Sequence, residues 1–315
     1  MCTRGMAIAE MKAETPNSTS ASSLEKDLEK GPDYEIGLTT GGIFGRYHDP
    51  VLPASRETKK IVSDMISLAG GSAAVLLQIA QPGVGAGVSN NSSFTTRPIE
   101  RGRRSMVYIY ATVLGTLEER RYITDATHLT HEKIKAANYN ANDPELQLWV
   151  AVTMYWSMIE SYENIYGKLD TETTERVYKE FSIYATSLNC PPEMWPKDLA
   201  AYREYFDKML DTLVVTPQVL ATAQDVLYLS GLPLLGKLVL SLSGPLTRIT
   251  TREMLPEKVR DQFGIPSTPH SRRVYKLITG VTRVVYPSLP KFVKHGMKNF
   301  YMWDMRRRMK KDLRW

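Results

Sequence analysis

Residues 131–153, with the sequence HEKIKAANYNANDPELQLWVAVT, predict a pair of consecutive helices. His131 lies on an amphipathic stretch, and Asn142-Asp143-Pro144 then marks the end of one helix and the start of the next. Asp is a favoured N-cap residue, and Pro is tolerated in the first helical turn. An apolar run with Trp149 follows, as expected of a buried helix. Because the chain has five histidines among 315 residues, we interpret His131 as a candidate metal ligand.

The same helical period continues on both sides of this stretch, from Gly41 onward. Strand signals are scarce, since there is no sustained alternation of apolar and polar residues and no Asn-Gly or Asp-Gly hairpin turn. The sequence therefore predicts an all-α fold, with residues 81–100 as a Gly-, Ser- and Asn-rich loop. We expect helices over 57–79, 101–119, 124–137, 144–167, 171–187, 198–213, 217–229, 232–246, 256–263, 271–285 and 290–311.

Composition divides the chain into a tail and one domain. Residues 1–35 are rich in Ser, Thr, Glu and Lys, and we expect them to be disordered because they cannot bury enough apolar surface. Residues 36–315 are expected to form a single helical domain. Within it, residues 226–247 are nearly uncharged but interrupted by Gly231, Pro233 and Lys237. These breaks favour two buried helical pieces around a cavity over a membrane-associated hairpin.

Charge and cysteine content exclude several classes of protein. The net charge is +6, but residues 306–311 alone carry five cations, a pattern typical of a solvated helix end. No aromatic-interleaved basic motif accompanies them, so no nucleic-acid partner is expected. Cys2 and Cys190 are too few and too far apart for a disulfide framework, and the N-terminus lacks the apolar core of a signal peptide. We therefore expect a cytoplasmic protein, with a location peripheral to an intracellular membrane as the alternative.

The histidines do not form the motif of a metal held by protein side chains alone. His128 and His131 are three residues apart and share a helix face, but neither an HExxH motif nor a repeated Glu-x-x-His motif is present. A haem b needs only one imidazole from the protein, because the porphyrin supplies four nitrogens. The residues Arg101-Gly102-Arg103-Arg104-Ser105 could bind its propionates at a helix start. A hydrogen-bonded core histidine and a solvated arginine cluster remain the alternatives.

Other catalytic motifs are absent from the sequence. There is no GxSxG elbow and no Walker A loop. Gly83-Val84-Gly85-Ala86-Gly87 resembles part of a dinucleotide fingerprint but has no strand before it. We interpret this stretch as a flexible connection, or as backbone that packs closely against a flat ligand.

Six motifs occur in order along the chain. They are Leu76-Leu77-Gln78-Ile79-Ala80-x-Pro82; Phe94-x-x-Arg97-Pro98-x-x-Arg101-x-x-Arg104-Ser105; Gly115-Thr116-x-Glu118-Glu119-Arg120; His131-x-x-Ile134; Tyr139-x-Ala141-Asn142-Asp143-Pro144-Glu145-Leu146-x-x-Trp149-Val150-x-x-Thr153; and Leu255-Pro256-x-x-Val259-Arg260-x-x-Phe263-Gly264. With these motifs the chain resembles the MpaB and latex-clearing (rubber oxygenase) family from about residue 42 to about residue 308.

The resemblance implies a globin-like helical fold and a haem b-dependent oxygenase. It makes His131 the proximal iron ligand, and it makes Arg101, Arg104 and Ser105 the polar group that meets the haem, its propionates or the distal side. A neutral imidazole on one side leaves the sixth iron position open to dioxygen. The chain departs from many relatives at Gln81 and Ala151, where they have histidine, and at Ala136, where they have glycine.

The expected activity is oxidation of an apolar small molecule with dioxygen, as a tailoring step in terpenoid or polyketide biosynthesis. The alternative is a non-catalytic helical protein that binds an apolar ligand or a membrane surface. Its basis is the C-terminal helix, where Phe292, Phe300, Met302 and Trp303 alternate with basic residues. The sequence does not predict the oligomeric state.

Overall fold

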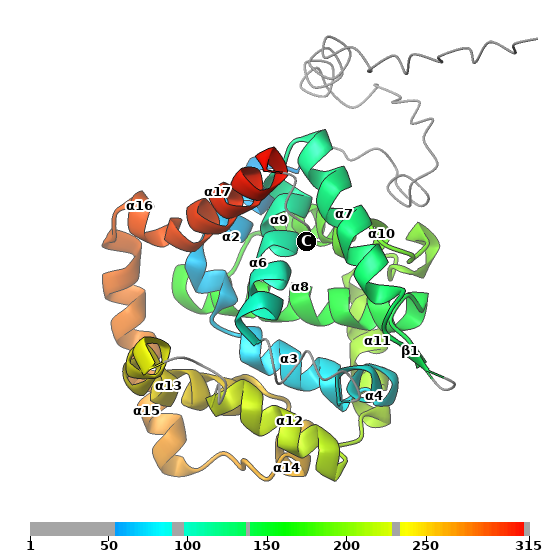
Figure 1. The fold of residues 1–315 in the computed structure, drawn as a ribbon. Coiled ribbons are helices and arrows are strands. Elements are labelled where there is room, and N and C mark those ends of the chain that lie inside the picture. Colours follow the sequence, from blue (N-terminus) through cyan, green and yellow to red (C-terminus); the bar gives the residue numbers. More distant parts are fainter. Residues whose placement is uncertain (1–53, 90–97, 137–138, 229–233, 312–315) are drawn as a thin grey trace, which may run out of the picture. The chain divides into compact units, whose positions relative to one another are not determined.

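The computed structural model describes residues 54–89, 98–136, 139–228 and 234–311 (Figure 1). These ranges are helical apart from turns and one short antiparallel hairpin, which confirms the all-α prediction. The globin-like arrangement stays a prediction. The elements are α2 (Arg56–Ser63), η1 (Met65–Leu68), α3 (Gly71–Ala80), α4 (Pro82–Ser89), α6 (Pro98–Leu114), α7 (Leu117–His131), β1 (Lys135–Ala136), β2 (Tyr139–Asn140), α8 (Pro144–Tyr166), α9 (Thr171–Phe181), α10 (Ile183–Thr186), η2 (Pro192–Met194), α11 (Leu199–Thr212), α12 (Pro217–Tyr228), α13 (Leu234–Met254), α14 (Glu257–Gln262), α15 (Pro269–Val285), η3 (Tyr286–Ser288), α16 (Lys291–Lys294) and α17 (Gly296–Lys310).

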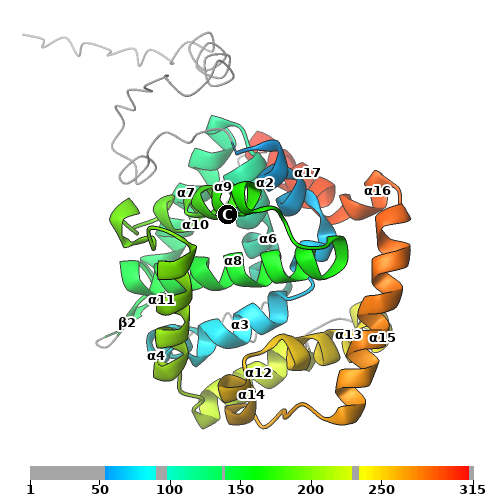
Figure 2. The same cartoon turned by 180° about the vertical axis from the view of Figure 1, so that it is seen from behind.

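The long helix α8 is the centre of the core, and α3 lies beside it in both views (Figures 1 and 2). It starts as the sequence predicts, because Asp143 Oδ1 accepts hydrogen bonds from the backbone N–H groups of Glu145 and Leu146, and Pro144 occupies the first turn. Its Tyr155 ring packs edge-on against Tyr178 of α9 and Tyr202 of α11, at centroid distances of 5.2 and 5.1 Å. Aromatic side chains therefore hold three helices together.

The C-terminal end of α3 depends on groups from distant elements. The last carbonyls of any helix lack intrahelical donors. Here the indole Nε1 of Trp149, in α8, donates to the Leu77 carbonyl at 3.1 Å, and the backbone N–H of Val214 donates to the Ala80 carbonyl at 2.8 Å. Both contacts join α3 to parts of the chain far away in the sequence.

The predicted helix over 57–79 is wrong in its continuity, because it consists of α2, η1 and α3. Asp64 causes the first break: its side chain caps η1 by accepting from the Ile66 N–H. The same carboxylate also accepts from the hydroxyls of Tyr166 and Tyr286, at 2.7 and 2.5 Å. A buried carboxylate with these partners is more stable outside a continuous helix than within it.

The predicted loop over 81–100 is wrong for residues 82–89, which form α4. Gln81 supplies the missing start signal, because its Oε1 accepts from the Val84 N–H at 2.8 Å. The predicted helix over 232–246 is too short, since α13 continues through Pro245 to Met254. Residues 229–233, where the break in the uncharged segment was expected, lie outside the described residues.

Other boundaries moved by smaller amounts. The helix predicted over 124–137 ends at His131 and is followed by the β1–β2 hairpin. The one predicted over 290–311 is divided at His295 into α16 and α17. Among the described residues no single helix has the length and apolar character to cross a membrane, although α2 together with the stretch from η1 to α3, bent by 64°, meets both criteria as a pair.

Candidate functional site

The hairpin of α6 and α7 brings the predicted site residues to one end of the helix pair. Only Gly115 and Thr116 separate the two helices. A Cβ at Gly115 would lie 2.5 Å from the Ala111 carbonyl oxygen, so this position needs glycine. Thr116 then starts α7 with a capping box, in which its hydroxyl accepts from the Glu119 N–H and the Glu119 carboxylate accepts from the Thr116 N–H.

This turn sets the positions of Arg101 and His131 along the axes of α6 and α7. Arg101 lies 14 residues before Gly115, and His131 lies 15 residues after Thr116. Because both helices rise by about 1.5 Å per residue and pack against each other (Figure 1), the two residues are at similar heights on neighbouring helices. The structure therefore brings the start of α6 and the end of α7 together, as a shared site requires.

His131 is a neutral imidazole whose Nδ1 atom has no hydrogen-bond partner among the described residues. Burial lowers its pKa to about 4, and the charge of neighbouring His128 adds a smaller effect in the same direction. Its Nδ1 atom is buried and has no hydrogen bond to any described residue. A buried polar atom left unpaired is costly, and a ring that is neutral at pH 7 with no competing proton partner can bind a metal.

His128 lies one turn earlier on α7, and both of its ring nitrogens are less available to bind a metal. Its Nε2 lies 3.3 Å from Glu132 Oε1, and its Nδ1 lies 3.4 Å from Asn189 Nδ2. Both ring nitrogens thus have protein partners. Of the two histidines that share this helix face, His131 is the one whose Nδ1 has no hydrogen-bond partner among the described residues.

A network of amides fixes the end of α7 to the start of α8. Asn142 Nδ2 donates to the His128 carbonyl at 3.4 Å, and Asn189 Nδ2 donates to the Asn142 carbonyl at 3.2 Å. Gln147 Oε1 accepts from the Asn189 N–H at 2.8 Å, and its Nε2 donates to the Ala141 carbonyl at 3.0 Å. Sequence reasoning missed Asn189, because its partners lie 42 to 61 residues away and no local motif marks it.

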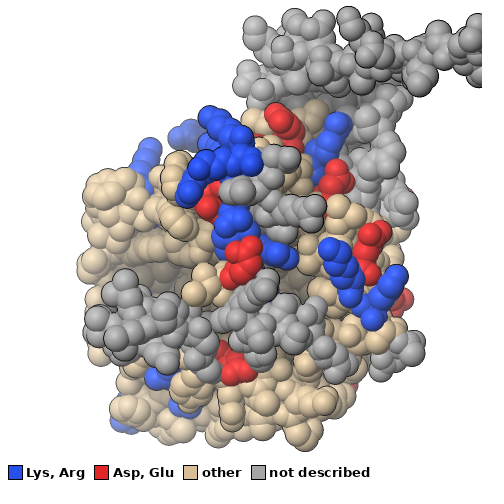
Figure 3. Space-filling view, in the orientation of Figure 1, with Lys and Arg blue, Asp and Glu red and all other residues tan. Residues whose placement is uncertain are grey.

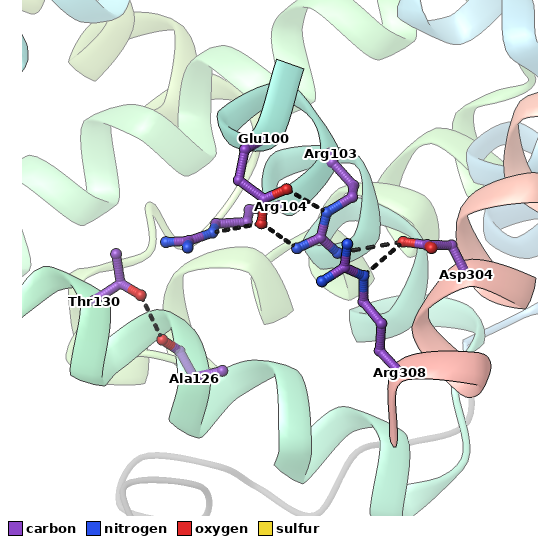
Figure 4. Close-up of polar contacts among 7 residues, drawn as sticks. All are labelled: Glu100, Arg103, Arg104, Ala126, Thr130, Asp304 and Arg308. Atoms are coloured by element: carbon purple, nitrogen blue, oxygen red, sulfur yellow. Dashed lines mark hydrogen bonds and ion pairs between the residues drawn. The ribbon is translucent and has the colours of Figure 1, made fainter. Parts of the chain in front are cut away.

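The predicted polar group at the start of α6 is brought only partly together. Burial lowers the pKa of Arg101 to about 10, so this side chain remains a cation at pH 7 in a desolvated setting. Arg104 Nε lies 3.5 Å from Glu100 Oε1, and its guanidinium points from α6 toward the α7 segment that carries Thr130 (Figure 4). Ser105 is exposed. Arg104 therefore points toward the end of α7, Arg101 is a desolvated cation on the same first turns of α6, and Ser105 is on the exposed side.

Arg103, between them in sequence, has a different role. It binds both Glu100 oxygens, at 3.0 and 2.5 Å, and its Nη1 lies 3.3 Å from Asp304 Oδ2 of α17 (Figure 4). The hydrogen bond from Arg103 is the largest cause that lowers the pKa of Glu100 to about 2. The buried Arg103 thus joins α6 to α17 through Asp304.

A second ion pair joins α7 to the same helix. Arg306 Nε lies 2.6 Å from Oε1 of Glu119, the residue that also completes the capping box of α7. The helix that carries His131 is thus attached to α17 at its first turn. Arg103 and Arg306 are therefore structural side chains of the hairpin.

The glycines of α4 allow the hairpin after His131 to pack closely. Gly87 is buried, and a Cβ there would lie 3.4 Å from the Tyr139 ring and 3.7 Å from Ile134 Cγ2. At Gly85 a Cβ would collide with the Ile79 carbonyl oxygen. The glycine-rich stretch is therefore a helix packed against β2, and the prediction of a flexible connection is wrong.

The motif that spans Leu76 to Pro82 and the motif that spans Tyr139 to Thr153 form one interface. The indole N–H of Trp149 reaches the Leu77 carbonyl, and Gln78 Nε2 donates to Thr153 Oγ1 at 2.9 Å. Their residues thus join α3 to α8 and do not lie in a polar site. Within the described ranges no group of three or more His, Cys, Asp or Glu side chains could hold a metal ion.

Comparison with known proteins identifies the domain. The model of the family described as ER-bound oxygenase mpaB/B'/rubber oxygenase, catalytic domain, matches residues 59–284. The chain belongs to this family. The uncharacterized proteins Mb2261 of Mycobacterium bovis and Rv2237 of Mycobacterium tuberculosis are each 29% identical to it over 241 residues, which is 74% of this chain and 93% of theirs. No solved structure matches.

Membership of the mpaB/rubber oxygenase family makes this chain an enzyme of the oxygenase type. The matched range includes the whole α6–α7 hairpin and both motif segments of the α3–α8 interface. It ends before α16 and α17. The family model therefore covers His131, Arg101 and Arg104, while the helix that anchors the hairpin lies beyond it.

Proposed function

We propose that this oxygenase depends on haem b, with His131 as the residue that would bind its iron. The observation that carries the proposal is the state of the His131 ring, which is neutral at pH 7 and has a buried Nδ1 without a partner in the part of the chain that the structure describes. A porphyrin needs one such imidazole from the protein and no cluster of further ligands. The residues present therefore fit the group.

The start of α6 fits the other end of a haem. Arg101 and Arg104 carry positive charge at the height of His131, and guanidinium groups form strong hydrogen bonds with carboxylates such as the haem propionates. Desolvation strengthens such contacts, because charges interact more strongly away from water. Ser105 adds a hydroxyl to the same helix, on its exposed side.

When bound, haem b would supply the activation of dioxygen that the amino acids of the chain cannot provide. The residues of the chain bind, orient and shield. His131 would bind the iron through its imidazole. The amide network around Asn189 holds this side chain in place, because it fixes the end of α7. Arg101 and Arg104 favour negative charge near that end of the hairpin, whether on propionates or on a reacting oxygen.

The proposed substrate is an apolar small molecule, oxidised with dioxygen in a terpenoid or polyketide tailoring pathway. Support for this part comes from the family resemblance. The description of the family names a rubber oxygenase, and rubber is itself apolar. The choice between carbon–carbon cleavage, hydroxylation and dehydrogenation is left to product analysis.

An absorption spectrum with iron analysis tests the cofactor. Wild-type protein expressed with a haem precursor should show a Soret band and about one iron per chain, and His131→Ala should lose both. His128→Gln is the matched control, since it changes a histidine on the same helix face whose nitrogens are already occupied. A colourless wild-type protein, or a His131→Ala variant that retains the band, would refute the assignment.

A further inference from the structure

The solvent face of α15 combines an apolar stripe with a row of cations. Leu277, Val281, Val284 and Val285 follow the i, i+4, i+7, i+8 spacing of one helix face, and their exposed fractions lie between 53% and 76%. Apolar faces of this kind are normally turned toward the core. Here the buried side of α15 is formed instead by Ser271 and by side chains such as Tyr275, which accepts from Asn164 of α8.

A further exposed apolar side chain follows the end of α15. Phe292, on α16, is 74% exposed and lies between Lys291 and Lys294 in the sequence. Both views place α15 and α16 at the outer edge of the helical domain (Figures 1 and 2). In Figure 3 the α16 corner is covered mainly by tan side chains, whereas blue side chains gather over α17.

The charges around the stripe have one sign. No Asp or Glu occurs between Asp261 and Asp304. In that interval α15 carries Arg272, Arg273, Lys276 and Arg283, and three lysines follow on α16 and α17. Arg272 donates to Ser267 Oγ and Arg283 donates to the Asn164 carbonyl, so the surface charge of α15 rests mainly on Arg273 and Lys276. The acids nearest to α15, Glu160 and Glu253, act on its buried side, where they raise the pKa of Tyr275 together with desolvation, the larger cause.

We propose that the exposed face of α15 and α16 binds the surface of an anionic lipid bilayer. Exposed apolar stripes mark protein or membrane contacts. Protein partners generally present charges of both signs, whereas an anionic leaflet complements a row of cations without acids. The apolar side chains enter the boundary between headgroups and acyl chains, and the cations contact the headgroups. The enzyme is then held beside the phase in which apolar molecules concentrate.

This location differs from the one that the sequence predicts. The basic end of α17 is partly occupied by internal contacts, since Arg306 pairs with Glu119 and Arg308 with Asp304. Met302, expected on the apolar side of that helix, is buried. The contact surface is therefore centred on α15, and it does not depend on whether His131 binds haem.

Vesicle flotation of the full chain tests the proposal. Wild-type protein should float with vesicles made of equal parts phosphatidylcholine and phosphatidylserine, and it should float much less with phosphatidylcholine alone or at high salt. Val284→Asp should weaken binding about tenfold, while Val214→Asp, at a valine that is 50% exposed in another segment, should not change it.

Charge reversal provides the second arm. Arg273→Glu with Lys276→Glu should weaken binding roughly 25-fold or more, since each cation near an anionic surface contributes about fivefold. Arg203→Glu with Lys208→Glu, two exposed positions on α11, is the control for net charge. Circular dichroism verifies that each variant is folded.

Three results would overturn the proposal. The first is wild-type protein that floats with neither vesicle, and the second is α15 variants that float as well as their controls. The third is a dimer in light scattering that Val284→Asp dissociates. The last result would make the α15 face an interface between two copies of the chain. A Soret band in wild-type protein and in every α15 variant keeps this test separate from the test of the haem assignment.

Discussion

Trp149→Phe should reveal how much the α3–α8 contact contributes to the stability of the domain. Trp149 is fully buried, and its indole N–H is the donor that reaches the Leu77 carbonyl at the end of α3. Phenylalanine keeps an aromatic ring against Phe206, whose centroid lies 5.6 Å away, but has no donor. The variant thus leaves a buried carbonyl unpaired, which costs about 1–3 kcal/mol, and adds a small cavity.

We therefore expect Trp149→Phe to lower the free energy of unfolding by about 2–4 kcal/mol. Trp149→Ala, which also removes the ring, should cost about 3–5 kcal/mol from the lost packing alone. For a domain with a total of about 5–15 kcal/mol, either loss is large. Urea unfolding followed by far-ultraviolet circular dichroism measures both.

Trp303→Phe is the matched control, because Trp303 is 55% exposed and makes its ring contacts at the surface of α17. Its cost should stay below about 0.5 kcal/mol. If Trp149→Phe cost no more than Trp303→Phe, the indole hydrogen bond would not be what stabilises the last turn of α3, and the account of this interface would be wrong.

Three further outcomes are expected. Gly115→Ala should destabilise the protein by about 1–3 kcal/mol because its Cβ collides with backbone, whereas Gly280→Ala, in open space on α15, should stabilise it by about 0.5–1 kcal/mol; thermal unfolding compares the two. The folded-state pKa of Glu100 is depressed from 4.5 to about 2, so its pair with Arg103 contributes stability above pH 4.5 that is lost as the pH falls toward 2. Arg103→Met should reduce this acid-dependent loss, measured as urea midpoints between about pH 6 and about pH 3, and an unchanged pH profile would contradict the assignment. Asn189→Ala should cost about 1–2 kcal/mol in urea unfolding, because two hydrogen bonds at the end of α7 disappear, and a neutral result would mean that the amide network does not fix this end.

Local signals were enough to predict the helices that begin with good caps. Asp143-Pro144 started α8 where expected, and Thr171 began α9 after the N-cap Asp170. The predictions failed where a distant side chain decides the backbone. Asp64 ends α2 because two tyrosine hydroxyls from elsewhere in the chain bind its carboxylate, and no window of sequence around residue 64 contains that information.

The same limit applies to the candidate site. The height shared by Arg101 and His131 follows from two helix lengths and one short turn, all of which are local properties. The different roles of Arg101, Arg103 and Arg104 are not a local property of the sequence. It depends on Asp304, 201 residues after Arg103, which makes the middle arginine structural. Spacing alone treats the three arginines alike.

The pairing of Glu119 with Arg306 has a consequence for the order in which the chain matures. The two residues are separated by 187 positions. At a synthesis rate of about 5–20 residues per second, Arg306 is synthesised roughly 10 to 40 seconds after Glu119. The ion pair at the first turn of α7 can form only after that delay. The helix that carries His131 is therefore completed late, and we expect any group bound there to be inserted after translation has nearly ended.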